Sequence, residues 1–279
     1  MLLTLLTLIA SALSAVFASQ TARSGAPTGY QTEDWPAGNL TMTGEVKLKL
    51  HIPQFRGARK TANIVIGLFG NHVPYTVANF AQLAAGGVLV KKEREGGRVE
   101  EVTLSYRDTP FHRIDKDIAF QGGDVVYKNG LGSLTIYNSS VIYPENFVLS
   151  NYGKGWVGMV HNGYAGNFTV GCQFYICMSN NRSVLSSLNQ QPFVVFGKVL
   201  RGMNELNRIN NRIDARFGGI ALNKTIDPLT GFPVNRPLQD IVIKESSYRQ
   251  YPQGAKEMTT NSPSNGSLFG EWPKAPESR

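Results

Sequence analysis

The segment from Phe111 to Asp124, FHRIDKDIAFQGGD, holds the side chains with the clearest chemical potential. Arg113 stays charged at any working pH, and its planar guanidinium group can be held by neighbours while one N–H faces a bound molecule. His112 is the residue type most often used as a general acid or base. The segment therefore offers two kinds of chemistry, electrostatic stabilisation by a fixed cation or proton transfer by an imidazole.

Short strands predominate among the elements that must position this segment. Val46, Leu48, Leu50 and Ile52 alternate with polar residues as in a half-buried strand, and residues 62–70 have the continuous apolar pattern of a buried one. Further short strands are predicted for TPFHRI, IAFQGGD, WVGMVH, QFYICM, FVVFGKVL and QDIVIKES.

Two helices are predicted between these strands. One covers TVANFAQLAAGG and stops at Gly86-Gly87, and the other runs from Val199 to Arg212. Residues 88–109 read as a polar, charged connection, longer than most loops of compact domains. Many short strands with two helices favour a mainly β fold, a closed barrel whose ends the helices cover. We expect one domain over residues 44–249, after a flexible segment (19–43) and before a disordered tail (250–279).

The apolar run of residues 1–18 predicts a signal peptide cleaved after Ala18, and a signal anchor is the alternative. The chain does not end in a Lys/His-Asp-Glu-Leu retention signal, so we expect a secreted, extracellular protein. Asn-x-Ser/Thr sequons agree with that route. The candidate glycosylation sites are Asn39, Asn138, Asn167, Asn181, Asn223 and Asn265.

The net charge of +8 is spread along the chain of 279 residues, so we do not expect nucleic-acid binding. The densest basic run, Lys91 to Arg98, contains two glutamates and reads as a solvated loop, with a patch for anionic extracellular polymers as the alternative. Cys172 and Cys177 lie about 16 Å apart if they share a strand, so they are predicted to be buried thiols without a disulfide between them.

Eight blocks of sequence occur in an order typical of one protein family: IVIGLFGNHVPYTVANF, FHRI, FQGGD, NGLG, PENF, YGKGWVGM, QFYI and VVFGKVLRGM. On these blocks the chain resembles the cyclophilin family, most closely its secretory-pathway branch. The resemblance implies a closed eight-stranded antiparallel barrel capped by two helices, with a groove that catalyses cis/trans isomerisation of Xaa-Pro bonds.

Matching the blocks residue by residue implies roles for the polar side chains. Arg113 stands at the position of the family's catalytic arginine, and Gln121 and Gln173 match the glutamines that orient it and grip the substrate backbone. Two strands within Phe111–Asp124 would set Arg113 beside Gln121. Isomerisation moves no proton, so the resemblance makes His112 a structural residue.

The expected proline pocket departs from the family's pattern. Ile118-Ala119 replace the usual Phe-Met, and Val160-His161 replace the usual Ala-Asn. Ser187 stands in place of the tryptophan on which cyclosporin recognition depends, so we expect weak cyclosporin binding. The predicted substrate-binding residues are Ile118, Ala119, Met159, Val160, His161, Gln173, Tyr175, Leu188 and Phe193.

Two functions remain open from the sequence. The first is a secreted peptidyl-prolyl isomerase working through Arg113, and the second is a weakly active or inactive module that binds proline-containing extracellular or matrix proteins. Retention of the arginine with both glutamines favours the isomerase, whereas the altered pocket favours the binding module. Rotation about an amide bond requires no metal or other cofactor, and we expect proline-containing polypeptides as partners of a monomer.

Overall fold

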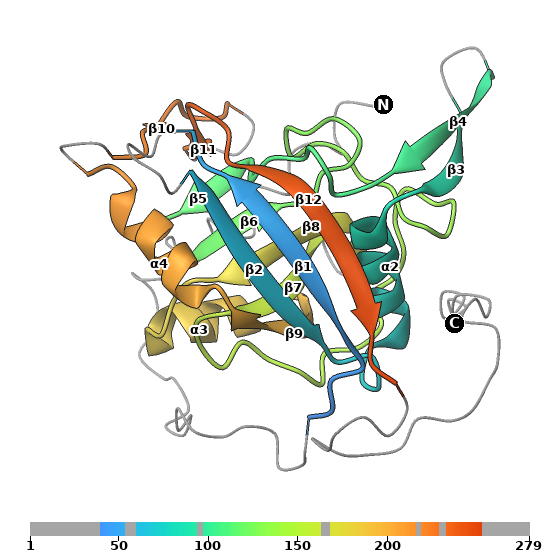
Figure 1. Ribbon diagram of the computed structural model, residues 1–279, viewed down its shortest axis with the longest axis horizontal. Coiled ribbons are helices and arrows are strands. Elements are labelled where there is room, and N and C mark those ends of the chain that lie inside the picture. Colours follow the sequence, from blue (N-terminus) through green and yellow to red (C-terminus); the bar gives the residue numbers. More distant parts are fainter. Residues whose placement is uncertain are drawn as a thin grey trace.

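The computed structural model describes residues 40–53, 60–93, 97–162, 168–215, 219–228 and 233–252. The described residues form a mainly β domain in which a curled antiparallel sheet is flanked by helices (Figure 1). The elements in chain order are β1 (Gly44–His51), β2 (Thr61–Leu68), α2 (Pro74–Ala85), β3 (Val88–Glu93), β4 (Val99–Leu104), β5 (Arg113–Asp115), β6 (Ala119–Gly122), β7 (Trp156–Asn162), β8 (Thr169–Cys177), α3 (Arg182–Asn189), β9 (Val194–Arg201), α4 (Met203–Arg212), β10 (Leu222–Asn223), β11 (Arg236–Pro237) and β12 (Val242–Gln250).

Eight of these strands form one sheet in the order β12-β1-β2-β9-β7-β8-β6-β5. The prediction of a mainly β antiparallel fold is confirmed, but that of a closed barrel is wrong. In the described residues the segment directly before β5 meets the start of β12 at an isolated bridge, Pro110 to Val242, but no ladder joins the edge strands β5 and β12 themselves. Past this bridge the edge of β5 is taken by another segment, because Ile114 N donates to Asn235 O at 2.9 Å. The sheet therefore curls without closing.

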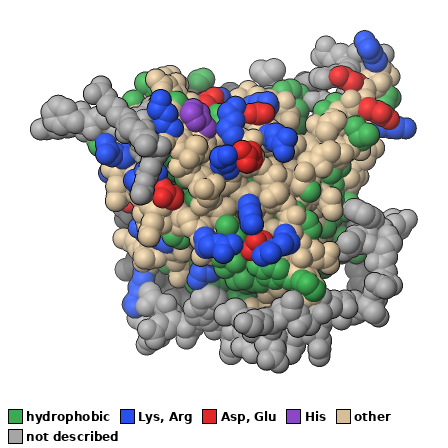
Figure 2. All heavy atoms as spheres, in the orientation of Figure 1, with side chains coloured by type: hydrophobic (Ala, Val, Ile, Leu, Met, Phe, Trp, Pro, Cys, Tyr) green, Lys and Arg blue, Asp and Glu red, His purple; other side chains and the backbone are tan. Residues whose placement is uncertain are grey.

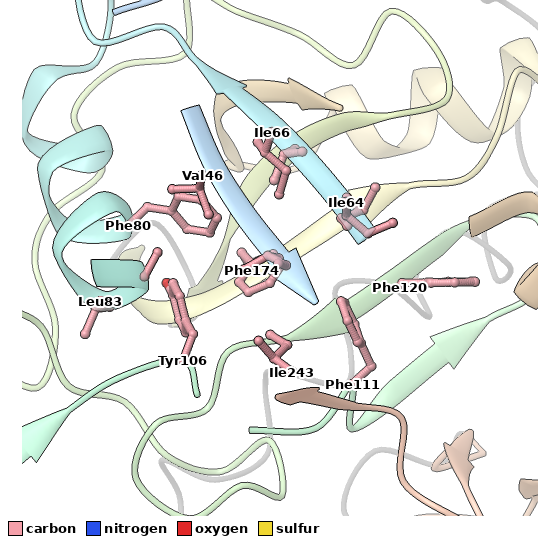
Figure 3. Close-up of a cluster of buried hydrophobic side chains, with 14 of the residues drawn as sticks. Val46, Ile64, Ile66, Phe80, Leu83, Tyr106, Phe111, Phe120, Phe174 and Ile243 are labelled. Atoms are coloured by element: carbon pink, nitrogen blue, oxygen red, sulfur yellow. The ribbon is translucent and has the colours of Figure 1, made fainter. Parts of the chain in front are cut away.

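The main core lies inside the curl of the sheet, where α2 packs against it (Figure 3). Phe80 of α2 contacts Phe174 of β8 edge-on, with ring centroids 5.2 Å apart, and Tyr106 lies 5.3 Å from both rings. Phe111, directly before the predicted site, packs against Phe120 and Phe174 at 6.3 and 6.0 Å. Aromatic anchoring thus fixes the segment that carries Arg113.

Two of the helices, α2 and α3, begin at a recognisable signal. α2 has Pro74 in its first turn, and Glu145 accepts hydrogen bonds from the N–H groups of Tyr75 and Thr76 at 3.1 and 2.9 Å. α3 was not predicted; Asn181 caps it by accepting from Ser183 N and Val184 N. Within the described ranges no helix is long and apolar enough to cross a membrane.

Two predicted segments differ in detail from the structure. The predicted helix from Val199 begins only at Met203, because residues up to Arg201 continue β9 and Gly202 adopts a left-handed φ of 97°. The expected connection over residues 88–109 contains a hairpin, β3 paired with β4, in which Val90 and Leu104 are buried. Lys91, at the start of the predicted loop, is therefore part of a strand.

Cys172 and Cys177 both lie on β8, as predicted, and both are buried free thiols. Burial raises the pKa of each to about 11, so neither is a thiolate at neutral pH. They behave as small apolar core residues.

Candidate active site

Strands β5 and β6 form a tight hairpin that sets Arg113 opposite Gln121 in the antiparallel register. Its turn contains Asp117 with φ of 60°, and α4 holds that residue from outside. Asn210 accepts from Asp117 N at 2.9 Å and donates from Nδ2 to Asp117 Oδ1 at 2.7 Å. The predicted side-by-side placement of Arg113 and Gln121 therefore exists, on a hairpin that tertiary contacts fix.

Gln121 and Gln173 form a hydrogen-bonded pair across β6 and β8. Gln121 Nε2 donates to Gln173 Oε1 at 2.9 Å, and Gln173 Nε2 donates to the carbonyl oxygens of Gly130 and Gly132 at 2.8 and 2.9 Å. Both amide groups are thereby oriented. Gln121 Oε1 is buried and has no hydrogen-bond partner in the described part of the chain, so it can accept a hydrogen bond from a bound molecule.

Asp124, the last residue of the QGGD motif, organises the loop that receives Gln173. Its Oδ1 accepts from the N–H groups of residues 126 and 127, and its Oδ2 accepts from those of residues 129, 130 and 132, at 2.9 to 3.1 Å. Burial raises the pKa of this carboxyl, but hydrogen bonds from Tyr127, Gly132 and other amides outweigh it and lower the pKa below its ordinary 3.8. This role of Asp124 was not predicted from the sequence, although Asp before a glycine-rich loop is a typical turn signal.

Arg113 is only 8% exposed. Its Nε donates to Asp115 Oδ2 at 2.7 Å, and Asp115 Oδ1 accepts from Asn235 Nδ2 at 2.6 Å. Neither Asp115 nor Asn235 was predicted to belong to the site. Asn235 is distant in the sequence, and no local pattern marks it.

The predicted apolar binding residues are all buried, and most of them form a second hydrophobic cluster outside the main core. The ring centroid of Phe193, a member of this cluster, lies 4.9 Å from that of Tyr175 and 5.1 Å from that of His161. Met159 is not brought together with them, because strand alternation turns it into the main core. Predicted residues in the second cluster are Ile118, Ala119, Val160, Tyr175, Leu188 and Phe193.

Comparison with known proteins identifies the arrangement. Residues 56–246 match the model of the cyclophilin type peptidyl-prolyl cis-trans isomerase/CLD family. The chain belongs to the cyclophilin family. It is 35% identical to peptidyl-prolyl cis-trans isomerase 11 of Caenorhabditis elegans over 155 residues, which cover 56% of this chain and 75% of the relative. It is 34% identical over 180 residues to peptidyl-prolyl cis-trans isomerase CYP21-1 of Arabidopsis thaliana, covering 64% and 71% respectively.

Family membership confirms the resemblance drawn from the eight blocks, while the secretory-pathway branch stays a prediction. The roles assigned to Arg113, Gln121 and Gln173 as cyclophilin site residues also remain predictions, now with a defined geometry. His112 is buried against Gly130, and burial lowers its pKa to about 4. Its imidazole is therefore neutral at pH 7. Among the described residues no group of three or more His, Cys, Asp or Glu side chains could hold a metal ion.

Basic and acidic side chains are mixed on the outer face of β1, β2 and β12 (Figure 2). Buried Glu45 pairs with Arg249 at 3.0 Å and with Lys47 and Arg201 at 3.7 Å, and Lys49 pairs with Glu245 at 2.6 Å. The positive charge of this face is thus partly neutralised by the protein's own carboxylates.

Three of the candidate glycosylation sites lie in described parts of the cyclophilin domain. Asn138 and Asn181 are exposed, and Asn223 is half-buried. Asn181 caps α3 through Oδ1, which leaves the amide nitrogen, the atom that carries a glycan, outside that contact. Asn39, Asn167 and Asn265 lie outside the described residues, as do the predicted signal peptide and most of both predicted flanking segments.

Proposed function

We propose that this cyclophilin is a peptidyl-prolyl cis-trans isomerase that accelerates Xaa-Pro rotation through Arg113. The observation that carries the proposal is the polar line across three adjacent strands. Arg113 of β5 is the register partner of Gln121 in β6, and Gln121 is hydrogen-bonded to Gln173 of β8. One buried cation beside an oriented amide pair is an arrangement that suits this reaction.

The chemistry follows from the amide bond. Resonance gives the uncatalysed rotation a barrier of about 18 to 20 kcal/mol, so spontaneous exchange takes tens of seconds or longer. A hydrogen bond from a guanidinium N–H to the prolyl nitrogen stabilises the pyramidal nitrogen of the twisted state more than the conjugated ground state. Gln121 Oε1, buried without a described partner, would accept from a substrate backbone N–H. No proton is transferred, which agrees with a buried neutral imidazole at His112.

A second candidate is a cyclophilin-like binding module for proline-containing extracellular or matrix proteins. The burial of the apolar residues favours it, because a proline ring needs accessible apolar surface. Phe193 occupies the space beside Tyr175 and His161 instead. A divergent, partly filled proline site would reduce turnover while leaving other contacts of the groove intact, and the missing tryptophan at Ser187 would weaken cyclosporin binding.

The test compares parent, Arg113→Ala and Arg107→Ala in a cis-to-trans assay with Ala-Ala-Pro-Phe-type peptides. Arg107 is an exposed arginine outside the polar line and serves as the matched control. Acceleration by the parent that falls at least about tenfold in Arg113→Ala and is unchanged in Arg107→Ala supports the isomerase. A folded parent no faster than buffer supports the binding module, which peptide titration then measures directly.

We further propose that the protein is secreted and glycosylated. The apolar run of residues 1–18 and the six sequons support this proposal. Intact mass of the protein from the medium of a eukaryotic host, before and after enzymatic removal of N-glycans, provides the test. The expected mass is that of a chain that begins at Ser19 and carries at least one glycan. A retained leader or an unmodified chain would contradict the corresponding part of the proposal.

A further inference from the structure

The guanidinium group of Arg113 is bound within its own strand. Residues 113 and 115 are two apart on β5, so strand alternation directs both side chains to the same face. The Arg113 and Asp115 side chains are 10% and 8% exposed, and the bond from Nε to Oδ2 is 2.7 Å long. A charge-assisted hydrogen bond between buried partners is strong and directional. Because the guanidinium is planar, fixing Nε also fixes the plane in which its other N–H groups point.

Asp115 is in turn held by Asn235, which lies 120 residues further along the chain. Asn235 Nδ2 donates to Asp115 Oδ1, and its backbone oxygen accepts from Ile114 N at 2.9 Å. Its own N–H donates to Asn223 O, and Lys224 Nζ donates to its Oδ1 at 3.2 Å. The segment beside the short β10–β11 pair therefore holds both Ile114, which lies between Arg113 and Asp115, and the carboxylate of Asp115.

The backbone at Asn235 suits this brace. Its φ of 53° lies in the left-handed region, which Asn adopts more readily than most residues. The left-handed turn lies directly before β11, so one residue offers both its carbonyl and its amide side chain to β5. This geometry serves no other described contact of the candidate active site.

We infer that Asp115 and Asn235 are positioning residues that hold Arg113 in the orientation required for isomerisation. The inference rests on the proposed function. An arginine side chain has many rotamers, and a hydrogen bond to the prolyl nitrogen depends on the direction of one N–H group. Holding the guanidinium before substrate arrives gives that direction in advance, and a misplacement of about 1 Å can lower a rate about a hundredfold. Asp115 and Asn235 act through Arg113 and need not touch the substrate.

The alternative is a buried ion pair that stabilises the fold and has no connection to catalysis. A double-mutant cycle separates the two roles. Asp115→Ala is expected to lower kcat/KM about tenfold to a hundredfold, mainly in kcat, in the parent background. In the Arg113→Ala background the same change is expected to lower the residual rate no further, because the residue through which Asp115 acts is gone. Equal losses in both backgrounds would overturn the inference.

Three single variants refine this test. Asp115→Asn keeps an acceptor for Arg113 Nε and is expected to retain more activity than Asp115→Ala. Asn235→Gly removes the amide without backbone strain at φ of 53°, and a smaller loss in kcat is expected. Glu205→Ala removes a carboxylate that pairs with Arg208 on α4, outside the site, and is expected to leave kcat/KM unchanged. Full activity in Asp115→Ala would contradict a positioning role.

An NMR measurement judges the inference even if the parent proves inactive. The Nε–H signal of Arg113 is expected to exchange slowly with solvent in the parent and faster in Asp115→Asn and Asn235→Gly. Both variants are expected to fold, because Asp115→Asn keeps a polar side chain and Asn235→Gly keeps the backbone groups that bond to β5. An inactive parent with a protected Nε–H would refute the proposed enzyme while leaving the positioning geometry supported. Rapid exchange in the parent, or exchange unaffected by either variant, would refute the positioning itself.

Discussion

His161 should make the folded protein sensitive to acid in a way that one substitution can isolate. Its imidazole lies between Phe168 and Phe193, with ring centroids 5.2 and 5.1 Å away. Burial lowers its pKa from the ordinary 6.5 to about 4. Between these values the unfolded chain binds a proton that the folded chain does not, so stability is full above pH 6.5 and falls as the pH is lowered toward 4. A pKa gap of about 2.5 corresponds to about 3 kcal/mol, at about 1.36 kcal/mol for each pH unit.

Urea unfolding between pH 4.5 and 7 measures this dependence. In the His161→Phe variant the slope of the unfolding free energy against pH is expected to fall by the contribution of about one proton. The contribution of His112, whose pKa is also about 4, is expected to remain. Tyr175→Phe is the matched control, since it touches the same cluster through Phe193 but removes no group that titrates in this range. An unchanged slope in His161→Phe would refute the reasoning. So would an NMR titration of the His161 ring in the parent with an apparent pKa above 6.

Three further substitutions test the supports of the site. Asp124→Ala removes the acceptor of five backbone N–H groups, two of them in buried bonds. It should lower the unfolding free energy by about 2 to 6 kcal/mol in urea titrations, and a loss below about 1 kcal/mol would contradict the proposed role. Phe193→Ala should lower it by about 3 to 5 kcal/mol, and an unchanged urea midpoint would mean that the ring is not packed as described. Glu145→Ala should cost about 0.5 to 2 kcal/mol and speed amide exchange at Tyr75 and Thr76, whereas unaltered exchange there would rule out the cap.

Local pattern predicted the strands of the hairpin that carries the site, and the family blocks predicted how they pair. Apolar and polar alternation marks the strands, and the glycines after Gln121 mark where the chain turns away, so the pairing of Arg113 with Gln121 could be expected from the family blocks. The helix at Pro74–Ala85 was predictable for the same reason, since its buried residues recur at helical spacing. These features depend on contacts close in sequence or on motifs with a fixed order.

What the sequence did not reveal depends on long-range contacts. Asn235 reaches Asp115 across 120 residues, and nothing in either neighbourhood signals the other. The same segment takes the edge of β5 at Ile114 and leaves the sheet open, which is why the expected barrel does not close. The β3–β4 hairpin was not predicted because of its charged residues. Val90 and Leu104 occupy core-facing positions of the two strands, but the lysines and glutamates around them suggested a loop.

The polar and apolar halves of the site make different demands on a substrate. Under the proposed function Arg113 and Gln121 need little rearrangement, because hydrogen bonds with Asp115 and Gln173 already orient them. The apolar residues are packed on one another, so a proline ring that used them would have to displace part of this packing, such as the ring of Phe193. The free energy of that opening sets the fraction of molecules that are open. The apparent affinity for substrate is reduced by that fraction, without a change in the chemistry at Arg113. A low kcat/KM that still depends on Arg113 would therefore point to opening as the limiting step, whereas a rate independent of Arg113 would leave binding as the function of the groove.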